Sequence, residues 1–261
     1  MIKAKILKDS VSPKGSRLTT FELEYPRYIL AELNTHRVFS RNTASSRAIP
    51  FDKMIDSIYE TDNKPMWTLN KAGMQGELIE DKRLIEECNA LWNEARNNAI
   101  FYARALKNQG VHKQNFNRLL EPFQTVKTIL TATDFDNFFK LRIHKDAMPE
   151  IRVLATLMKE ELEKSEPVLV DYGQWHLPYI TSKDLKTYGV DDCKRISVSC
   201  CAQVSYRKLD TSAEKALEIY LKLITGDIIH GSAFEHVATP VDKPCLGNFN
   251  GWLQFRHMIE G

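Results

Sequence analysis

Residues 17–47 read RLTTFELEYPRYILAELNTHRVFSRNTASSR, a strand pattern followed by a helix pattern and a dense polar loop. Apolar and polar residues alternate over 17–25, which is typical of a strand with one buried face. Pro26 suits the first turn of a helix, because its missing N–H would have no partner there and its φ is already helical. We therefore expect the strand to lead directly into a helix that runs through residues 28–39.

The sequence after this stretch predicts more helices. We expect a short helix over 51–59, a long loop to residue 80, and a helix over 113–120. Between them, residues 81–108 carry apolar positions three, four or seven residues apart, which predicts an amphipathic helix that ends before Gly110. Those apolar positions are Leu84, Cys88, Leu91, Ala95, Tyr102 and Ala105.

The second half of the chain is less regular. Residues 124–144 fit a strand, a helix or both, and Pro149 opens a clear helix that Pro167 stops. Residues 196–206 are interpreted as a strand or a buried turn, and residues 212–225 as a further helix. The apolar face of the helix after Pro149 consists of Ile151, Leu154, Ala155, Met158 and Leu162.

The composition is that of an ordinary globular protein. The chain has 261 residues, 43% of them hydrophobic and 27% charged, so it can bury a sizeable core. Its net charge of +2 gives no field that would attract nucleic acid or an anionic membrane. With no long apolar run and no signal-peptide pattern at its start, we expect a cytoplasmic protein with no membrane or nucleic-acid partner. The cysteines form no CxxC pair, which favours buried thiols in a reduced compartment: they are Cys88, Cys193, Cys200, Cys201 and Cys245.

The polar loop 35–47, THRVFSRNTASSR, is the densest group of side chains that could bind an anion. Arginine matches the oxygens of a phosphate with two parallel hydrogen bonds, and serine hydroxyls can add to them. The same composition also suits a solvated helix C-terminus, where the helix dipole favours cations. Both interpretations stay open on composition alone.

Other residues that could carry chemistry are more scattered. The segment HGSAFEH, 230–236, has histidines six residues apart, which is not the spacing of a helical zinc pair, so we expect no metal site. Arg118 and Arg142 lie among apolar residues, where a charged group either needs a partner or ligand or must reach the surface. Ser45 or a cysteine could act as a nucleophile only beside a base. The chain contains no GxGxxG and no P-loop.

Residues 35–47 contain THR, then the seven residues VFSRNTA, then Ser45, Ser46 and Arg47. This pattern resembles the signature of the flavin-dependent thymidylate synthases, in which Arg-His-Arg, seven residues and Ser are followed closely by Gly-Arg. The preceding TFELEYPRYILAELN fits the same family without a gap. FNRLLEP at 116–122 and ATDFDNFFKLR at 132–142 resemble, in the right order, its Arg-containing segment before a proline and its Asn-x-x-x-Leu-Arg segment.

Two more motifs resemble the family but stand in the wrong place. AQVSYRKL at 202–209 and HGSAFEH at 230–236 resemble its Ala-Arg-Val-Ser-Phe and His-x-Thr-Pro-Phe-Glu-His motifs, which normally precede the signature. WLQFRHM at 252–258 resembles a second, shortened copy of the signature region. The resemblance therefore implies an α+β fold, a mixed sheet with helices packed on it, with a permuted order of elements in a single domain spanning 1–261. Segments 48–80 and 168–195 have no counterpart.

The resemblance also implies a function. Members of the family methylate dUMP at carbon 5 to give dTMP, with methylenetetrahydrofolate as carbon donor and NADPH as reductant. FAD carries the hydride and lies between the subunits of a homotetramer. The implied activity is thus that of a methyltransferase with dUMP as substrate and FAD as cofactor.

The resemblance implies roles for individual residues of this sequence, matched to the family's motifs position by position. Arg142 matches the arginine at the uracil edge that favours an ionised pyrimidine, so it is the predicted catalytic residue. The predicted nucleotide-binding residues are Glu32, Thr43, Ser45, Ser46, Arg47, Arg118 and Arg142. The predicted flavin-binding residues are Thr35, His36, Arg37, Thr131, Thr133, Asn137, His230 and Ser232.

Several positions depart from the family pattern. Thr35 stands where the family has the first arginine of its signature, and Glu32 stands where it has a glutamine. Thr43 replaces a glutamate of the family, and Gln203 replaces an arginine. Arg256, in the second copy, is a candidate replacement for the arginine missing at 35. Because a carboxylate at 32 only accepts hydrogen bonds, whereas glutamine also donates, we expect altered binding chemistry.

Two alternatives stand beside dTMP synthesis. The departures favour a related flavin and folate enzyme that makes 5-hydroxymethyl-dUMP or another C5-modified pyrimidine nucleotide. The second alternative is a protein that binds the nucleotide or the flavin without turnover, because a fold does not guarantee a function. The segment YGQWHLPY at 172–179 either fills the core or lines the folate site.

Overall fold

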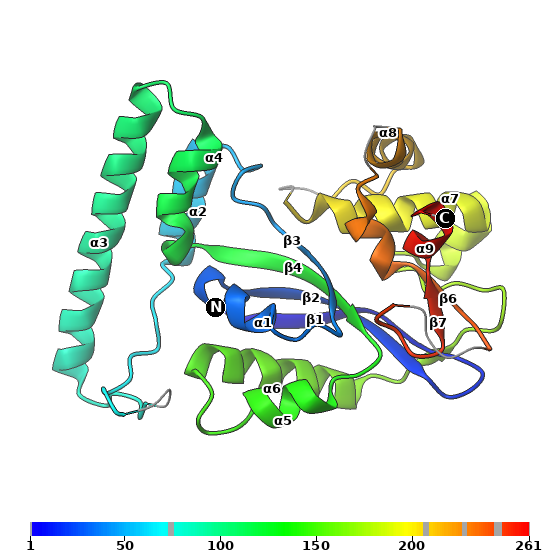
Figure 1. Cartoon of the computed structure of the whole chain (residues 1–261), viewed down its shortest axis with the longest axis horizontal. Helices are drawn as coiled ribbons and strands as arrows, with labels where there is room; N and C mark the ends of the chain where they lie inside the picture. Colours follow the sequence, from blue (N-terminus) through cyan, green and yellow to red (C-terminus); the bar gives the residue numbers. More distant parts are fainter. Residues whose placement is uncertain (1, 73–75, 206–208, 226–228, 243–246, 261) are drawn as a thin grey trace.

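A mixed five-stranded sheet of order β3-β4-β2-β1-β5 lies at the centre of the computed structural model (Figure 1), which describes residues 2–72, 76–205, 209–225, 229–242 and 247–260. Neighbouring strands are antiparallel except for the parallel pair β1 and β5. A separate antiparallel pair joins β6 and β7. The strands are β1 Lys3–Val11, β2 Arg17–Pro26, β3 Ser40–Thr43, β4 Thr125–Ala132, β5 Val168–Leu169, β6 Ala238–Pro240 and β7 Trp252–Gln254. The expected α+β class with a mixed sheet is confirmed, while the permuted order of motifs stays a prediction.

Helices surround this sheet. Those before β4 are η1 Arg27–Ile29, α1 Leu30–Leu33, α2 Phe51–Thr61, α3 Lys82–Asn108, α4 Lys113–Phe116 and η2 Asn117–Phe123. Those after it are α5 Asp136–Arg142, α6 Pro149–Lys164, α7 Ser182–Ala202, η3 Gln203–Ser205, α8 Ala213–Ile224, η4 Gly231–His236 and α9 Phe255–Glu260.

The alternation of side chains along β4 divides the core into two layers. Leu130 packs with α6 on one face of the sheet, and its neighbour Ile129 packs with α7 on the other. Figure 1 shows α5 and α6 below the sheet and α7, α8 and α9 together at its right-hand end. A third cluster holds α3 against α2 and η2 at the left-hand edge of the molecule.

Most of the expected elements are confirmed. Strand 17–25 is β2, and the helices expected at 51–59, 81–108, after Pro149 and at 212–225 are α2, α3, α6 and α8. Residues 124–144 form a strand followed by a helix. The helix expected over 113–120 forms as α4 followed by η2, which continues past Pro122 to Phe123.

Two expectations are wrong. The helix expected over 28–39 ends at Leu33, because residues 40–43 pair with β4 and the guanidinium of Arg41 donates to the carbonyls of Leu33 (3.0 Å) and His36 (2.9 Å). The strand or turn expected over 196–206 is the end of α7 and η3, apart from residue 206, which lies outside the described residues. Residues 196–201 are all buried, so the sequence shows no polar face from which a helical period could be recognised.

Cys193, Cys200 and Cys201 are buried free thiols and Cys88 is half-buried, whereas Cys245 lies outside the described residues. Within the described ranges, no helix is long and apolar enough to cross a membrane. The same ranges contain no group of three His, Cys, Asp or Glu side chains arranged to hold a metal ion.

Candidate active site

Arg142, the last residue of α5, contacts three residues of α1 and the turn after it. Its Nε donates to His36 Nε2 (3.0 Å) and its Nη2 donates to Thr35 Oγ1 (3.1 Å). Its Nη1 lies 3.5 Å from Glu32 Oε2. The structure thus brings together the predicted catalytic residue and three other predicted site residues that are more than a hundred positions away in the sequence.

The geometry fixes the protonation of His36. The residue is 8% exposed, and its ring packs edge-on against Phe138, with 4.8 Å between ring centroids. Burial lowers the pKa of His36, and the nearby charges of Arg142 and Arg41 lower it further. Because Nε2 accepts the hydrogen bond from Arg142, the neutral ring carries its proton on Nδ1. His36 therefore positions the Arg142 cation without competing with its charge.

A second cluster gathers around Glu121, the glutamate of FNRLLEP, for which the sequence predicts no role. Glu121 Oε1 accepts from Ser46 Oγ at 2.6 Å and lies 3.1 Å from Arg27 Nη2 and 3.4 Å from Arg118 Nη1. This carboxylate holds together two predicted nucleotide-binding residues, Ser46 and Arg118. It also leaves the Arg118 side chain 57% exposed, so other N–H donors of that guanidinium remain accessible.

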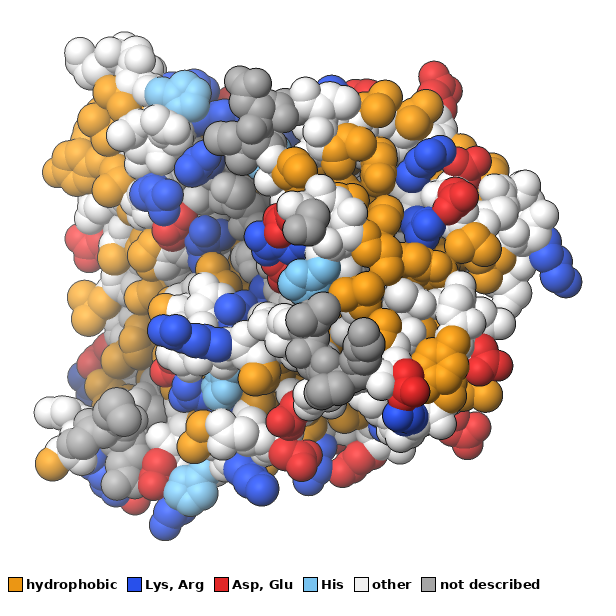
Figure 2. Space-filling view, turned by 45° about the vertical axis from the view of Figure 1, so that its right-hand side comes forward, with side chains coloured by type: hydrophobic (Ala, Val, Ile, Leu, Met, Phe, Trp, Pro, Cys, Tyr) orange, Lys and Arg blue, Asp and Glu red, His pale blue; other side chains and the backbone are white. Residues whose placement is uncertain are grey.

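The Glu121 cluster borders a surface cavity of about 470 Å³. Helix α1 and the turn after it contribute Leu30, Ala31 and Asn34 to the lining of this cavity. From the same stretch, Glu32 and Thr35 contact Arg142. One short helix thus connects the Arg142 cluster to the Glu121 cluster. Figure 2 shows Lys and Arg side chains gathered around a hollow in one face of the molecule.

A larger cavity of about 680 Å³ lies elsewhere. Its lining consists of residues 69, 71, 76–78, 80, 145, 146 and 152, none of which is a predicted site residue. Its walls carry both signs of charge, as with Lys71 and Glu77, which form an ion pair. The smaller cavity is therefore the better candidate for the nucleotide.

Five buried side chains form a continuous hydrogen-bonded chain through the sheet, called the relay below. Ser10 Oγ bonds His176 Nδ1 (2.8 Å), and His176 Nε2 bonds Thr20 Oγ1 (2.8 Å). Thr20 Oγ1 bonds Thr131 Oγ1 (2.7 Å), which bonds His236 Nδ1 (2.8 Å). All five residues have no exposed surface. The relay thus ties β1, β2 and β4 to the segments around 176 and 236.

Both histidines of the relay are neutral. Burial lowers the pKa of His236 to about 3 and lowers that of His176 well below its ordinary value. A neutral imidazole donates from one nitrogen and accepts at the other, so His176 donates one of its two bonds in the relay and accepts the other. At its end, His236 Nε2 is buried with no hydrogen-bond partner among the described residues.

Some predicted site residues lie apart from these clusters. Thr131 is buried within the relay, Thr43 Oγ1 bonds Thr128 Oγ1 (3.0 Å), and Thr133 Oγ1 accepts from the Asn250 N–H (3.1 Å). Ser45 is half-buried. The exposed members are Arg37, Arg47, Asn137, His230 and Ser232.

The motif at 230–236 and the second signature copy both lie against β3. Gln254 Nε2 donates to Ser40 Oγ (2.9 Å) and to the carbonyl of Glu235 (3.1 Å). Arg256 pairs with Glu235 and Glu260, whereas Thr35 contacts Arg142. In the described contacts it is therefore Arg142, and not Arg256, that brings a guanidinium to Thr35.

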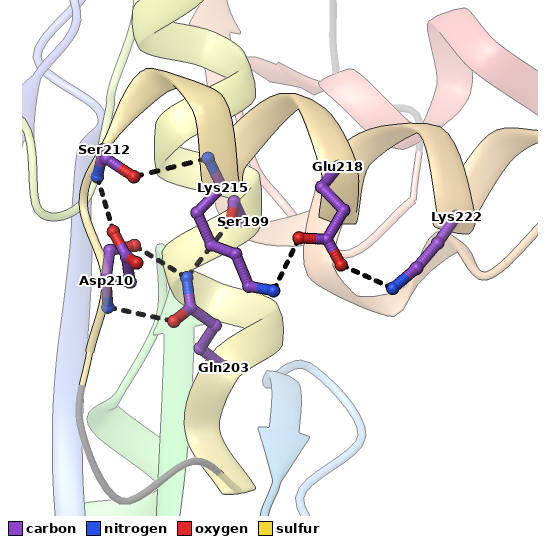
Figure 3. A network of polar contacts seen from close by, with 7 residues as sticks. All are labelled: Ser199, Gln203, Asp210, Ser212, Lys215, Glu218 and Lys222. Carbon is purple, nitrogen blue, oxygen red and sulfur yellow. Dashed lines mark hydrogen bonds and ion pairs between the residues drawn. The ribbon is translucent and has the colours of Figure 1, made fainter.

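Gln203, one of the departures from the family pattern, has a structural role (Figure 3). Its side-chain amide donates to the Asp210 carbonyl (2.8 Å) and accepts from the Asp210 N–H (3.0 Å). It also donates to Ser199 Oγ (3.1 Å), one turn earlier in α7. Gln203 thus joins the end of α7 to the start of the segment that leads into α8.

The second half of the segment at 172–179, left open by the sequence, is packed inside, whereas residues 172–174 are exposed. His176 belongs to the relay and Leu177 is 2% exposed, while Trp175 packs edge-on against Phe255 with 5.5 Å between centroids. This placement favours the structural interpretation of the segment.

Comparisons with known proteins show the family and the fold of this chain. The sequence model of the family Thy1, thymidylate synthase complementing protein, matches residues 12–168, which is more than half of the chain. No curated protein sequence matches. Among solved structures, the UMP/dUMP methylase PolB from Streptomyces cacaoi, bound with 5-Br UMP, has a TM-score of 0.51 at 16% identity, covering 65% of this chain and 90% of that one.

A flavin-dependent thymidylate synthase from Helicobacter pylori, complexed with FAD and dUMP, is more distant in structure. It has a TM-score of 0.38 at 18% identity and covers 56% of this chain and 67% of that one. The similarity to the methylase shows the fold, and the family match shows the lineage. The chain belongs to the Thy1 family, the thymidylate synthase complementing proteins.

Proposed function

We propose that this protein is a flavin-dependent enzyme that transfers a one-carbon group from methylenetetrahydrofolate to carbon 5 of dUMP, giving dTMP, with NADPH as reductant. The observation that carries the proposal is the Arg142 cluster, in which the predicted catalytic arginine is oriented by His36, Thr35 and Glu32. Membership of the Thy1 family supports it. A protein of similar fold is described as a UMP/dUMP methylase, which also supports a pyrimidine nucleotide as substrate.

The two clusters suit the two ends of a nucleotide. The phosphate would bind Arg118 at the cavity beside Glu121, because its exposed guanidinium lines that cavity and supplies charged donors, and Arg47, which is also exposed, is a second predicted contact. Ser46 donates its proton to Glu121 and so would hold that carboxylate in place beside Arg118. The base would lie beside Arg142, whose side chain is 21% exposed. A fixed cation there stabilises negative charge on the pyrimidine ring, which activates the ring in the absence of an enzyme nucleophile.

The exposed residues fit a large polar cofactor. Arg37, Asn137, His230 and Ser232 offer donors and acceptors at the surface of the chain. This exposure is compatible with FAD binding between the subunits of a homotetramer, which the family resemblance implies. Bound FAD would supply the hydride chemistry, and the residues of this chain would bind it and orient the nucleotide against it.

The relay supports the same assignment. It connects His236 of the motif at 230–236 to Thr131 on β4, and β4 leads into the helix that ends at Arg142. The segment that carries the predicted flavin residues His230 and Ser232 is therefore anchored to the strand before the catalytic arginine.

The departure at Glu32 motivates a second candidate product, 5-hydroxymethyl-dUMP. The carboxylate of Glu32 lies 3.5 Å from Arg142, where the family has a neutral glutamine. A negative charge there weakens the field of Arg142 and adds an acceptor beside the base. The two products differ by one oxygen atom, so product mass distinguishes them.

The test is anaerobic mixing of the flavin-loaded protein with NADPH, with and without dUMP, followed by mass spectrometry of the nucleotide after folate is added. We expect flavin bands that bleach faster when dUMP is present, and dTMP as product. Hydroxymethylated product would select the second candidate. Flavin and dUMP binding without product would identify a binding protein, and no uptake of FAD would contradict the proposal.

A further inference from the structure

Arg41, on β3, is the one arginine of the loop 35–47 to which the family resemblance gives no role. It is half-buried, and a cation that is partly out of water needs polar partners. The charge of Glu235 acts on it, but that carboxylate is paired with Arg256. The partners that the described contacts give Arg41 are backbone carbonyls.

These carbonyls lie at the two ends of one short turn. Arg41 Nη1 donates to the carbonyl of Leu33, the last residue of α1, at 3.0 Å and to that of His36 at 2.9 Å. Within the turn, the His36 N–H donates to the Leu33 carbonyl (3.3 Å). The turn carries Thr35 and His36, whose side chains accept hydrogen bonds from Arg142. One nitrogen of Arg41 thus holds the turn that presents two acceptors to Arg142.

The strand that carries Arg41 is fixed on its other face. Ser40 Oγ accepts from Gln254 Nε2 (2.9 Å), and Asn42 Nδ2 donates to the Cys201 carbonyl (2.6 Å). Because side chains alternate along a strand, Arg41 lies on the face opposite to these contacts, and β3 itself is paired with β4. Arg41 therefore projects from a strand that is held on two sides, which is the kind of support that fixes the side chains of a functional site.

We propose that Arg41 is a positioning residue for the reaction: it holds the turn 33–36 so that Thr35 and His36 stay in place as the acceptors for Arg142. The inference rests on the proposed function, because it assumes that Arg142 activates the pyrimidine. A guanidinium suits this task, because its planar fork presents N–H donors in fixed directions. A lysine would bring the same charge on a flexible stem, without those fixed directions.

The charge of Arg41 supports the same role. Burial lowers the pKa of His36, and the cations Arg142 on α5 and Arg41 on β3 lower it further. The rings packed against His36 are two phenylalanines, and the nearby carboxylate of Glu32 is paired with Arg142. A protonated His36 would have no lone pair for Arg142 Nε and would repel its charge. Removing the Arg41 charge should therefore raise the pKa of His36, so that the ring protonates at a higher pH and releases Arg142.

The first test is the titration of His36 by NMR, in protein labelled with carbon-13 in its histidine rings and with His36→Gln to assign the signal. Arg41→Gln removes the charge but keeps an N–H donor, whereas Arg41→Lys keeps the charge. We expect a higher pKa of His36 in Arg41→Gln and a pKa close to that of the parent in Arg41→Lys. Arg152→Gln is the control and should leave the pKa of His36 unchanged. Arg152 is also half-buried and donates to a carbonyl, that of Lys145 (3.2 Å), but it is not one of the described cations that lower the pKa of His36. A pKa of His36 that is unchanged in Arg41→Gln would overturn the proposal.

The second test is turnover, normalised to bound flavin so that a loss of folded protein is not counted. Arg41→Gln should lower kcat on the order of tenfold to a hundredfold, with flavin absorbance and the Kd of dUMP close to those of the parent. The acidic limb of its kcat profile should lie at higher pH than in the parent, whereas Arg41→Lys should keep the parent limb. An unchanged kcat and an unchanged limb in Arg41→Gln would show a merely structural residue and overturn the proposal. An inactive parent protein would contradict the proposed function only, because the titration of His36 needs no turnover.

Discussion

The relay predicts a measurable energetic coupling between Thr131 and His236. Thr131→Val replaces a hydroxyl by a methyl group of the same size, and so removes the hydrogen bonds to Thr20 and to His236 Nδ1. Thr20 keeps its hydrogen bond to His176. The His236 side chain loses the one hydrogen bond that it makes in the described contacts, because its Nε2 already has no partner there. An unpaired buried polar group costs about 1 to 3 kcal/mol, so we expect a loss of about 2 to 4 kcal/mol in the free energy of unfolding.

His236→Phe separates the contributions. Phenylalanine keeps the ring and has no nitrogen to leave unpaired, so in that background Thr131→Val removes only the bond to Thr20. It should then cost about 1 to 2 kcal/mol less than in the parent protein. The assay is urea unfolding of the parent, both single variants and the double variant.

Thr128→Val provides the control. Thr128 lies on the same strand and is equally buried, but its hydroxyl bonds Tyr25 and Thr43. Its cost should be of similar size and should add to that of His236→Phe. If the costs of Thr131→Val and His236→Phe in the free energy of unfolding add to within about 0.5 kcal/mol, as those of independent sites do, the relay does not couple the two residues and the prediction is refuted.

The remaining predictions concern pH and the two arginines. Because burial lowers the pKa of His236 to about 3, its neutral form stabilises the fold above the unfolded pKa of about 6.5, and stability should fall below that pH by up to about 1.4 kcal/mol per pH unit. Chemical unfolding at several pH values measures this slope, and His236→Phe should reduce it. Arg142→Ala should lower kcat about a hundredfold or more with unchanged flavin absorbance, whereas unaltered turnover would remove Arg142 from the catalytic role. Arg118→Ala should weaken dUMP binding by about 1.5 to 3 kcal/mol in a calorimetric titration, and Lys113→Ala, a nearby lysine that bonds a backbone carbonyl, should not. Equal affinity of the parent for uridine and dUMP would contradict the assignment of a phosphate site.

The sequence predicts well where a single face of a helix or strand is buried. Strand 17–25 and the helix after Pro149 have clean periodic patterns, and both form where expected. In α3 the sequence predicts the helix but not which face packs, because two apolar faces lie side by side on it. Only the tertiary contacts decide between them.

The failures have a common physical origin in long-range contacts. The helix after Pro26 is shortened by the pairing of β3 with β4, a strand more than eighty residues away. The final turns of α7 are buried on every side, so periodicity disappears from their sequence. Tertiary environment overrides local pattern in both cases.

The residues of the candidate site also divide into those that the sequence predicts and those that only the tertiary structure reveals. Arg142, His36, Thr35 and Glu32 were predicted by resemblance, and the structure places them in contact. Glu121 and His176 were not predicted, because a glutamate before a proline and a histidine in an aromatic segment carry no spacing signal. Their roles follow only from the partners that the fold brings to them, Ser46 and Arg118 in one case and Ser10 and Thr20 in the other.

The bonds between the early strands and the last described segments have a consequence for the order of folding. Trp252 Nε1 donates to the Ser16 carbonyl (3.2 Å), and Gln254 reaches Ser40, across separations of more than two hundred residues. During translation, β2 and β4 can pair while residues 230–254 are still inside the ribosome, but His236 and Gln254 can take their places only afterwards. Contacts of such separation close slowly, because the loop entropy is lost before the contact is gained. The predicted flavin-binding residues His230 and Ser232 should therefore be placed last, and flavin uptake should lag behind secondary structure in a refolding time course.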